Sequence, residues 1–250
     1  MSKIAFITGA TSGIGYATAK IFAANGIDLI LCGRNKKQLE KIEKELSSFA
    51  KVTTLNFDVR DKETVKSSIN SLSAEWKQID ILVNCAGNAH GLSSIENGDV
   101  EDWDMMIDGN VKGLLYVSKF IMPLMVERKQ GHIVNISSVA GKYTYQNGAV
   151  YCASKKAVEA ISEGMRLDLT QYGIKVTNIA PGAVETNFSV VRFKGDAERA
   201  KKVYEGFNPI KPEDVADAIL YAIQAPKNVT IADIVLYAEA QAAPTTIYRK

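Results

Sequence analysis

Short apolar runs alternate with longer helical stretches along almost the whole chain, and this alternation restricts the fold more than any other feature. Most runs are continuously apolar, as expected for strands that are covered on both faces. The stretches between the runs place apolar side chains such as Leu39, Ile42 and Leu46 on one helical face. Regular strand–helix–strand order predicts a mostly parallel sheet with right-handed crossovers and helices on both faces. The predicted strands are Lys3–Thr8, Asp28–Cys32, Val52–Phe57, Ile79–Asn84, His132–Ser137, Lys175–Ile179 and Ile231–Leu236.

The predicted fold class is therefore α/β, with a doubly wound, mostly parallel seven-stranded sheet in a single domain spanning residues 1–250. A chain of 250 residues that is 46% hydrophobic and 23% charged suits one core. Ligands of such sheets bind beyond the carboxyl ends of the strands. The one irregular stretch, residues 182–208, precedes the last helix and is a candidate lid over that edge.

Composition argues against several classes of partner. The net charge of +2 gives no support for nucleic acid. Lys119 and Pro123 interrupt the longest apolar stretch, so no membrane span is expected. Cys32, Cys85 and Cys152 lie far apart without metal-ligand spacing, which predicts reduced thiols and no metal site. The N-terminal residues lead directly into a strand and leave no room for a signal peptide, so a cytoplasmic location is expected.

A glycine-rich turn, Thr8–Gly15, joins the first strand to the first helix. Glycines permit a tight turn and a close ligand approach, and the helix N-terminus offers unpaired N–H groups to a pyrophosphate. The G-x3-G-x-G spacing differs from the general dinucleotide fingerprint, but its position favours a Rossmann-type nucleotide site over an ordinary turn. The residues predicted to contact the cofactor here are Gly9, Thr11, Ser12, Gly13, Ile14 and Gly15.

The end of the second strand indicates which dinucleotide binds. An acidic residue there would bind the ribose 2′-hydroxyl of NAD, but no carboxylate occurs from Leu29 to Leu39. Arg34 stands where a 2′-phosphate would lie, and a guanidinium suits bidentate phosphate binding. The sequence therefore favours NADP(H). The alternative is that Arg34 belongs to a solvated start of the next helix.

Tyr151 and Lys155 are four residues apart and share one helix face. Tyr16 and Lys20 have the same spacing, so the spacing alone decides nothing. Only Tyr151 follows a strand end with a serine, Ser138, 13 residues upstream. This context favours Tyr151 as an acid–base group.

Together with these residues, several segments occur in the order and setting seen in short-chain dehydrogenases/reductases, and the chain resembles that family over essentially its whole length. Further segments resemble the branch of bacterial NADP-dependent 3-hydroxy acid dehydrogenases, which also oxidise serine and allo-threonine. The segments that carry the family resemblance are Thr8–Gly15, Asn84–Gly87, Asn110, Ser138, Tyr151, Lys155 and Pro181–Thr186. Those that carry the branch resemblance are Val100–Trp103, Met125–Arg128 and Val191–Asp196.

The resemblance implies a role for each residue. Tyr151 would exchange a proton with the substrate oxygen, and Lys155 would lower the pKa of Tyr151 and bind the nicotinamide ribose. Ser138 would hydrogen-bond the substrate oxygen, and Asn110 would hold a water in the proton path. Cys85, where many relatives carry Asn, is a departure from the pattern. The further cofactor contacts that the resemblance implies are Asp58, Val59, Asn84, Ala86, Gly87, Pro181, Val184 and Thr186.

The carboxylate of a small hydroxy acid needs a cation near the nicotinamide, and Lys155 is already used. The candidate lid carries Arg192 and Lys194, one of which we expect to bind the carboxylate unless both are solvent-facing lid charges. His90 is either a substrate contact or an exposed loop residue, with the latter favoured.

Other residues point to structure rather than chemistry. We expect His132 to be structural and Cys152 to serve packing. The face formed by Ile107, Val111 and Leu114 belongs to the core or to a subunit contact. The resemblance implies a homotetramer.

Two alternative functions stay open. One is a general carbonyl or 3-oxoacyl-thioester reductase. The other is a non-catalytic NADP-binding regulator, which the presence of all four catalytic residue types disfavours.

Overall fold

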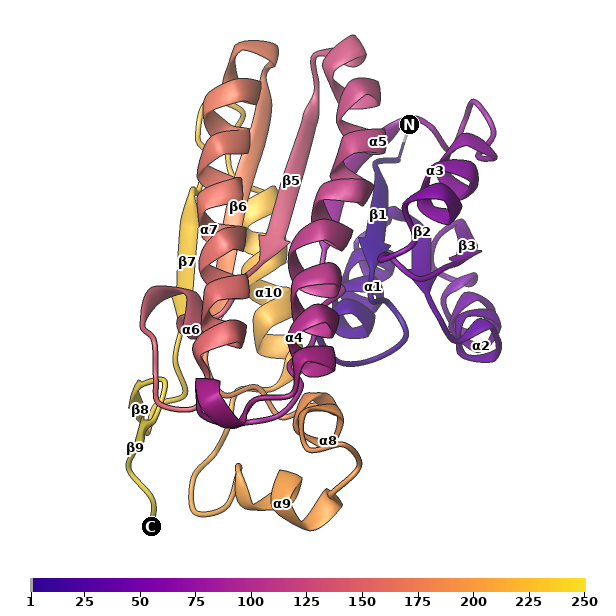
Figure 1. Ribbon diagram of the computed structural model, residues 1–250. Coiled ribbons are helices and arrows are strands. Elements are labelled where there is room, and N and C mark those ends of the chain that lie inside the picture. Colours follow the sequence, from indigo (N-terminus) through magenta and orange to yellow (C-terminus); the bar gives the residue numbers. More distant parts are fainter. Residues whose placement is uncertain (1) are drawn as a thin grey trace.

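The computed structural model describes residues 2–250 and contains a seven-stranded parallel sheet with helices on both faces (Figure 1). The strand order is β3-β2-β1-β4-β5-β6-β7, so the chain reverses direction across the sheet between β1 and β4. Every strand lies within two residues of its predicted bounds, and the predicted fold class is confirmed. The strands are β1 (Ile4–Thr8), β2 (Asp28–Gly33), β3 (Val52–Asn56), β4 (Ile79–Asn84), β5 (Gly131–Ile136), β6 (Ile174–Pro181) and β7 (Asp233–Leu236).

Two layers of helices explain why the strands are apolar on both faces. Along β1, Ala5 and Ile7 pack toward one layer, whereas Ile4 and Phe6 pack toward the other. The first layer consists of α1 (Gly13–Ala24), α2 (Lys36–Leu46) and α10 (Pro212–Ile223). The second consists of α3 (Lys62–Asn70), α5 (Gly113–Arg128) and α7 (Ala149–Leu169).

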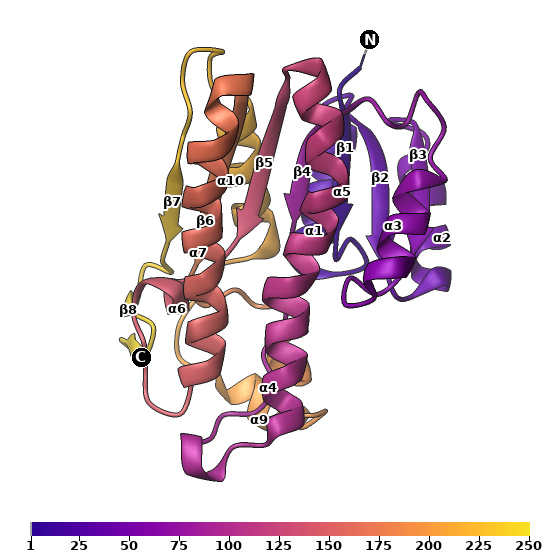
Figure 2. The same cartoon turned by 45° about the horizontal axis from the view of Figure 1, so that its top comes forward.

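Asn110 lies within one long helical rod, in which two helices run on from one another (Figure 2). It consists of α4 (Val100–Ile107), a π-helical turn (Asp108–Lys112) and α5. A π turn holds one more residue than an α turn and is frequent at functional sites. The predicted apolar face divides here, because Leu114 is buried in the core while Ile107 and Val111 stay half-exposed.

The segment predicted as an irregular lid is partly helical, with α8 (Phe188–Arg192) and α9 (Ala197–Lys202). After β7 the chain forms a small antiparallel hairpin, β8 (Gln241–Ala243) and β9 (Thr246–Ile247), which the sequence analysis did not predict. Short helices also form at α6 (Val139–Lys142), Ile95–Asn97 and Thr170–Tyr172. Within residues 2–250, no helix has both the length and the apolar character needed to cross a bilayer.

Candidate active site

A cavity of about 460 Å³ lies beyond the carboxyl ends of the central strands. Ser138, Tyr151 and Lys155 line it, together with Arg192 from the end of α8. The lid and the C-terminal hairpin supply other parts of its wall. The topology therefore brings residues that are distant in sequence to one edge of the sheet, as parallel strands do.

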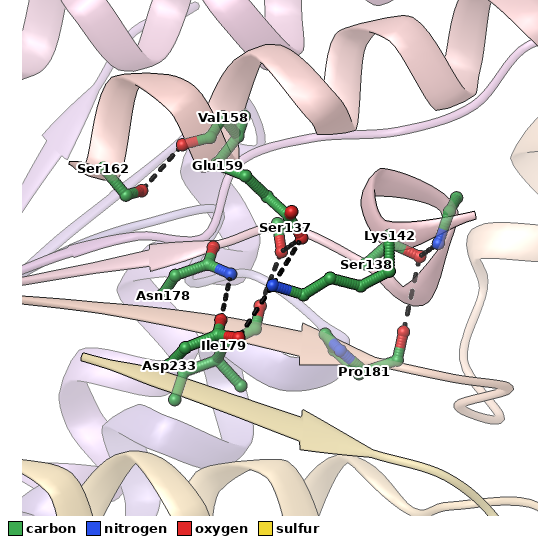
Figure 3. Close-up of polar contacts among 11 residues, drawn as sticks. Ser137, Ser138, Lys142, Val158, Glu159, Ser162, Asn178, Ile179, Pro181 and Asp233 are labelled. Atoms are coloured by element: carbon green, nitrogen blue, oxygen red, sulfur yellow. Dashed lines mark hydrogen bonds and ion pairs between the residues drawn. The ribbon is translucent and has the colours of Figure 1, made fainter. Parts of the chain in front are cut away.

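Ser138 is held between two strand ends. Its Oγ accepts a hydrogen bond from the Ala140 amide at 3.1 Å, which caps α6, and donates to the Pro181 carbonyl at 3.3 Å (Figure 3). The first bond fixes the serine to the helix that follows β5, and the second fixes it to the end of β6. Its hydroxyl is thus positioned before any substrate binds.

A polar network lies directly behind this serine (Figure 3). Lys142 Nζ lies 3.2 Å from Glu159 Oε1 and 2.7 Å from Asp233 Oδ2. Ser137 Oγ donates to Glu159 Oε1 at 3.3 Å. Burial disfavours the charge of Lys142, but the hydrogen bonds that its ammonium donates to both carboxylates outweigh this effect and raise the pKa of the lysine. The network ties α6, α7 and β7 together around the serine.

Tyr151 and Lys155 are both buried, one turn apart on α7. Burial lowers the pKa of Lys155 to about 8, and its Nζ donates to the Ile136 carbonyl at 3.1 Å. Burial is also the largest influence on Tyr151: it raises the pKa well above the usual value, and Tyr145 adds to the increase. The Ser138 hydroxyl and the Arg192 guanidinium act in the opposite direction without reversing it.

The expected lowering of the Tyr151 pKa by Lys155 is therefore wrong for the protein as it stands. Desolvation of the phenolate outweighs the nearby charges. Tyr151 keeps its proton at neutral pH, which is the state needed to protonate a carbonyl oxygen.

The oxygen and the nitrogen of the Asn110 side chain both form hydrogen bonds with other residues of the protein. Its Oδ1 accepts from the Asn88 amide at 2.8 Å, and its Nδ2 donates to the Asn88 carbonyl at 2.8 Å and to Ser154 Oγ at 3.0 Å. Both amide hydrogens are thus occupied. The side chain fixes the loop after β4 against α7, and the water-holding role implied by the resemblance stays a prediction.

The two lid cations have different surroundings. Arg192 donates from Nε to the Gly91 carbonyl at 3.2 Å, and its guanidinium lies 5.6 Å from the centre of the Tyr151 ring. Its Nη2 is buried without a hydrogen-bond partner among residues 2–250. Lys194 points elsewhere and lies 3.0 Å from a carboxylate oxygen of Asp99 and 3.0 Å from one of Asp102. Of the two predicted carboxylate partners, only Arg192 lines the cavity.

A second cavity, of about 250 Å³, extends along the glycine turn. The two cavities share wall residues, Ile14, Cys85, Gly87, Thr186 and Phe188, so they form one continuous site. Gly9 has a φ of +66°, and a Cβ there would lie 3.0 Å from Ala86. Ser12 caps α1 without a side-chain bond, which leaves the first N–H groups of the helix open to an anion. This cradle fits a dinucleotide pyrophosphate.

A pair of arginines stands at the adenosine end of this groove. Arg34 is largely exposed and lies 3.9 Å from Asp58, whereas Arg60 forms a close ion pair with Asp58 at 2.7 Å. Burial alone would raise the pKa of Asp58, but the hydrogen bonds and charge of Arg60, with the charge of Arg34, bring it below its usual value. The carboxylate stays ionised and orients Arg60, which the sequence analysis missed. Its position two residues after Asp58 was the available signal.

Comparison with known proteins decides the family. Residues 3–196 match the family described as short chain dehydrogenase. The chain belongs to the short-chain dehydrogenase family.

Similar proteins cover nearly the whole of this short-chain dehydrogenase. It is 43% identical to the NADP-dependent 3-hydroxy acid dehydrogenase YdfG of Salmonella typhi, over 91% of this chain and 92% of the relative. It is 38% identical to an NADP-dependent 3-hydroxy acid dehydrogenase of Schizosaccharomyces pombe, over 99% of this chain and 97% of the relative. The closed form of a serine dehydrogenase complexed with NADP+ superposes with a TM-score of 0.93 at 39% identity, covering 99% of this chain and 100% of the other. The resemblance stated from the sequence is confirmed.

Most residues predicted to contact the cofactor line the two cavities of the short-chain dehydrogenase. The exception is Asn84, whose side chain is buried and donates to Ser118 Oγ at 3.0 Å and to Asn135 Oδ1 at 2.9 Å. It lies inside the protein between β4, β5 and α5 and lines neither cavity. The residues that line the cavities are Gly9, Thr11, Ser12, Gly13, Ile14, Gly15, Arg34, Asp58, Val59, Ala86, Gly87, Tyr151, Lys155, Pro181, Val184 and Thr186.

The remaining candidates occupy structural positions in this short-chain dehydrogenase. Burial lowers the pKa of His90, which lines a small pocket that shares Tyr151 and Arg192 with the large cavity but does not line the large cavity itself. His132 is buried in β5, with Nε2 2.8 Å from Thr177 Oγ1. Cys152 is buried in a small apolar cluster, as predicted.

Proposed function

We propose that this enzyme transfers a hydride between NADP(H) and a small 3-hydroxy acid or its oxo form. Arg192 is the observation that supports an acid as the substrate. Its guanidinium is half-buried beside Tyr151, and its Nη2 has no hydrogen-bond partner among the described residues. A buried cation with an unmade hydrogen bond is an expected partner for a carboxylate. The names of the relatives in Salmonella typhi and Schizosaccharomyces pombe support both the cofactor and the substrate class.

The side chains supply what carbonyl reduction requires. NADPH, when bound, supplies the hydride. Tyr151 gives its proton to the carbonyl oxygen, and the Ser138 hydroxyl turns its proton from the Pro181 carbonyl to donate a hydrogen bond to the same oxygen. In the oxidative direction Tyr151, as phenolate, accepts the hydroxyl proton. Lys155, one turn further along the same helix, would bind the nicotinamide ribose, as the family resemblance implies.

The adenosine end supports NADP(H) over NAD(H). Arg34 and Arg60 stand at the groove beside Asp58, and a guanidinium pair suits the additional phosphate. We assign Arg34 the main contact, because Arg60 is already paired closely with Asp58.

The direct test is reduction of NADP+ with serine, 3-hydroxypropionate and 3-hydroxyisobutyrate, each compared with NAD+. We expect turnover with at least one acid and a clear preference for NADP+. Turnover confined to neutral ketones or to 3-oxoacyl thioesters would support the alternative reductase instead. NADPH binding without turnover on any of these compounds would support the non-catalytic regulator.

We further propose a homotetramer that acts in the cytoplasm, as the family resemblance implies. Leu115 on α5 and Leu167 on α7 support a subunit contact, because both apolar side chains are exposed. Light scattering coupled to size-exclusion chromatography tests the assembly, and a monomeric mass under assay conditions would contradict it.

A further inference from the structure

The C-terminal hairpin closes one end of the large cavity. Pro244, Thr245 and Ile247 line this end, together with Val203 and Tyr204 from the lid. Val203 and Tyr204 fall within the predicted lid, whereas the hairpin residues were not predicted to take part in the site. Their position makes the C-terminal hairpin part of the wall of the substrate compartment.

Main-chain and side-chain contacts fasten this tail to the lid. Arg249 donates from Nη2 to the Val203 carbonyl at 3.1 Å, and its guanidinium stacks 5.2 Å from the Phe207 ring centre. The Lys250 amide donates to the Gly206 carbonyl at 2.8 Å. A Cβ at Gly206 would lie 3.0 Å from Arg249 Cβ, so the two segments touch closely. Tail and lid therefore form one continuous wall.

The polar groups of this wall are used within the protein. The Tyr204 hydroxyl donates to the Val184 carbonyl at 2.9 Å, and Ser189 Oγ lies 2.8 Å from the same hydroxyl. Gln241 Oε1 accepts from the Ala183 amide at 2.9 Å. The charge of Arg249 is directed at main-chain carbonyls. What remains for a ligand at this end is the apolar surface of Val203, Pro244 and Ile247, beside the hydroxyl of Thr245.

We propose that this apolar end binds an alkyl substituent on C3 of the substrate, so that the enzyme prefers longer-chain 3-hydroxy acids to the smallest ones. The inference rests on the proposed function, which assigns the carboxylate to Arg192 and the hydroxyl to Ser138 and Tyr151. The cavity of about 460 Å³ must also receive the nicotinamide end of the cofactor, for which Lys155, Pro181 and Thr186 of its wall are the expected contacts. The room for an alkyl chain is the separate apolar end formed by Val203, Pro244 and Ile247. Each methylene group transferred from water to this wall improves kcat/KM about fourfold.

The test is a chain-length series with NADP+: 3-hydroxypropionate, 3-hydroxybutyrate, 3-hydroxyhexanoate and 3-hydroxyoctanoate. We expect kcat/KM to rise along the series until the cavity is full. Ile247→Trp fills the apolar end, and we expect it to lower kcat/KM for 3-hydroxyhexanoate at least tenfold while 3-hydroxypropionate stays within about twofold. Tyr248→Ala is the matched control, because the neighbouring side chain is 71% exposed, and it should change neither substrate.

The outcomes separate the two proposals. Turnover of 3-hydroxypropionate with kcat/KM falling along the series would overturn the inference and leave the proposed function standing. The absence of turnover on every hydroxy acid would overturn the proposed function. Equal losses on short and long acids in Ile247→Trp would also overturn the inference, provided that NADPH binds as in the wild type. Ile247→Ala gives a second reading, since it keeps the wall open and should reduce only the preference for longer chains.

Discussion

Replacing Arg192 with Gln should separate carboxylate recognition from the rest of catalysis. The guanidinium lies 5.6 Å from the ring centre of Tyr151, and its Nη2 has no partner within the described chain. A hydrogen bond to a charged group contributes about 1.5–3 kcal/mol. At about 1.4 kcal/mol for each factor of ten, kcat/KM on the acid should fall roughly 10-fold to 150-fold.

The assay compares a hydroxy acid with its methyl ester in the wild type and in the variant. The ester has the same hydroxyl and no negative charge, so we expect Arg192→Gln to change its kcat/KM by less than about threefold. Lys194→Gln is the matched control on the same lid. Asp99 and Asp102 already neutralise Lys194, so its loss should not discriminate between acid and ester.

Two results would refute this reasoning. Equal losses on acid and ester in Arg192→Gln would mean that the guanidinium only packs against Tyr151 and Tyr145. A selective loss on the acid in Lys194→Gln would mean that the lid rearranges and that Lys194 binds the carboxylate.

Substitutions at Tyr151, Arg34 and His132 test the proton donor, the cofactor preference and the pH dependence of stability. Tyr151→Phe should lower kcat about 10²-fold to 10⁴-fold and leave the NADPH dissociation constant unchanged by fluorescence titration, and near-normal turnover would exclude Tyr151 as the proton donor. Arg34→Asp should raise the KM for NADPH much more than that for NADH, and a wild type that already prefers NAD+ would contradict the cofactor assignment. Burial lowers the pKa of His132 from 6.5 to about 4, so the unfolded chain binds a proton first as the pH falls below 6.5. Urea unfolding should therefore show about 2 kcal/mol less stability at pH 5 than at pH 7.5, and His132→Phe should remove that difference. An unchanged pH dependence in the variant would assign it to other groups.

The fold could be predicted from the sequence, because it depends on short-range patterns, whereas the catalytic roles came largely from the family resemblance and stay predictions. Continuous apolar runs define buried parallel strands, and residues that follow such strands must meet at one edge of the sheet. Ser138 and the glycine turn follow from this rule, whereas Tyr151 lies in α7 and was chosen by its spacing to Lys155 and Ser138. The prediction needed no knowledge of the exact packing.

Features that depend on packing could not be obtained in this way. The direction of the Tyr151 pKa shift is set by burial, which spacing along a helix does not reveal. Arg192 and Lys194 are two residues apart, and the turn after α8, with Lys194 at a φ of +54°, sends them in different directions. The C-terminal hairpin has strands of three and two residues, too short for any periodicity to appear.

The π-helical turn at Asp108–Lys112 has a consequence for variation in chain length. A single extra residue in a helix rotates everything after it by about 100° relative to what precedes it. Deleting one residue here would allow an unbroken α-helix to form from Val100 to Arg128. Either Met106 would then turn away from the apolar cluster that it forms with Tyr151 and Cys152, or Val117 would turn away from the sheet. Surface loops of this protein can change in length, but the middle of its longest helical rod has a fixed residue count.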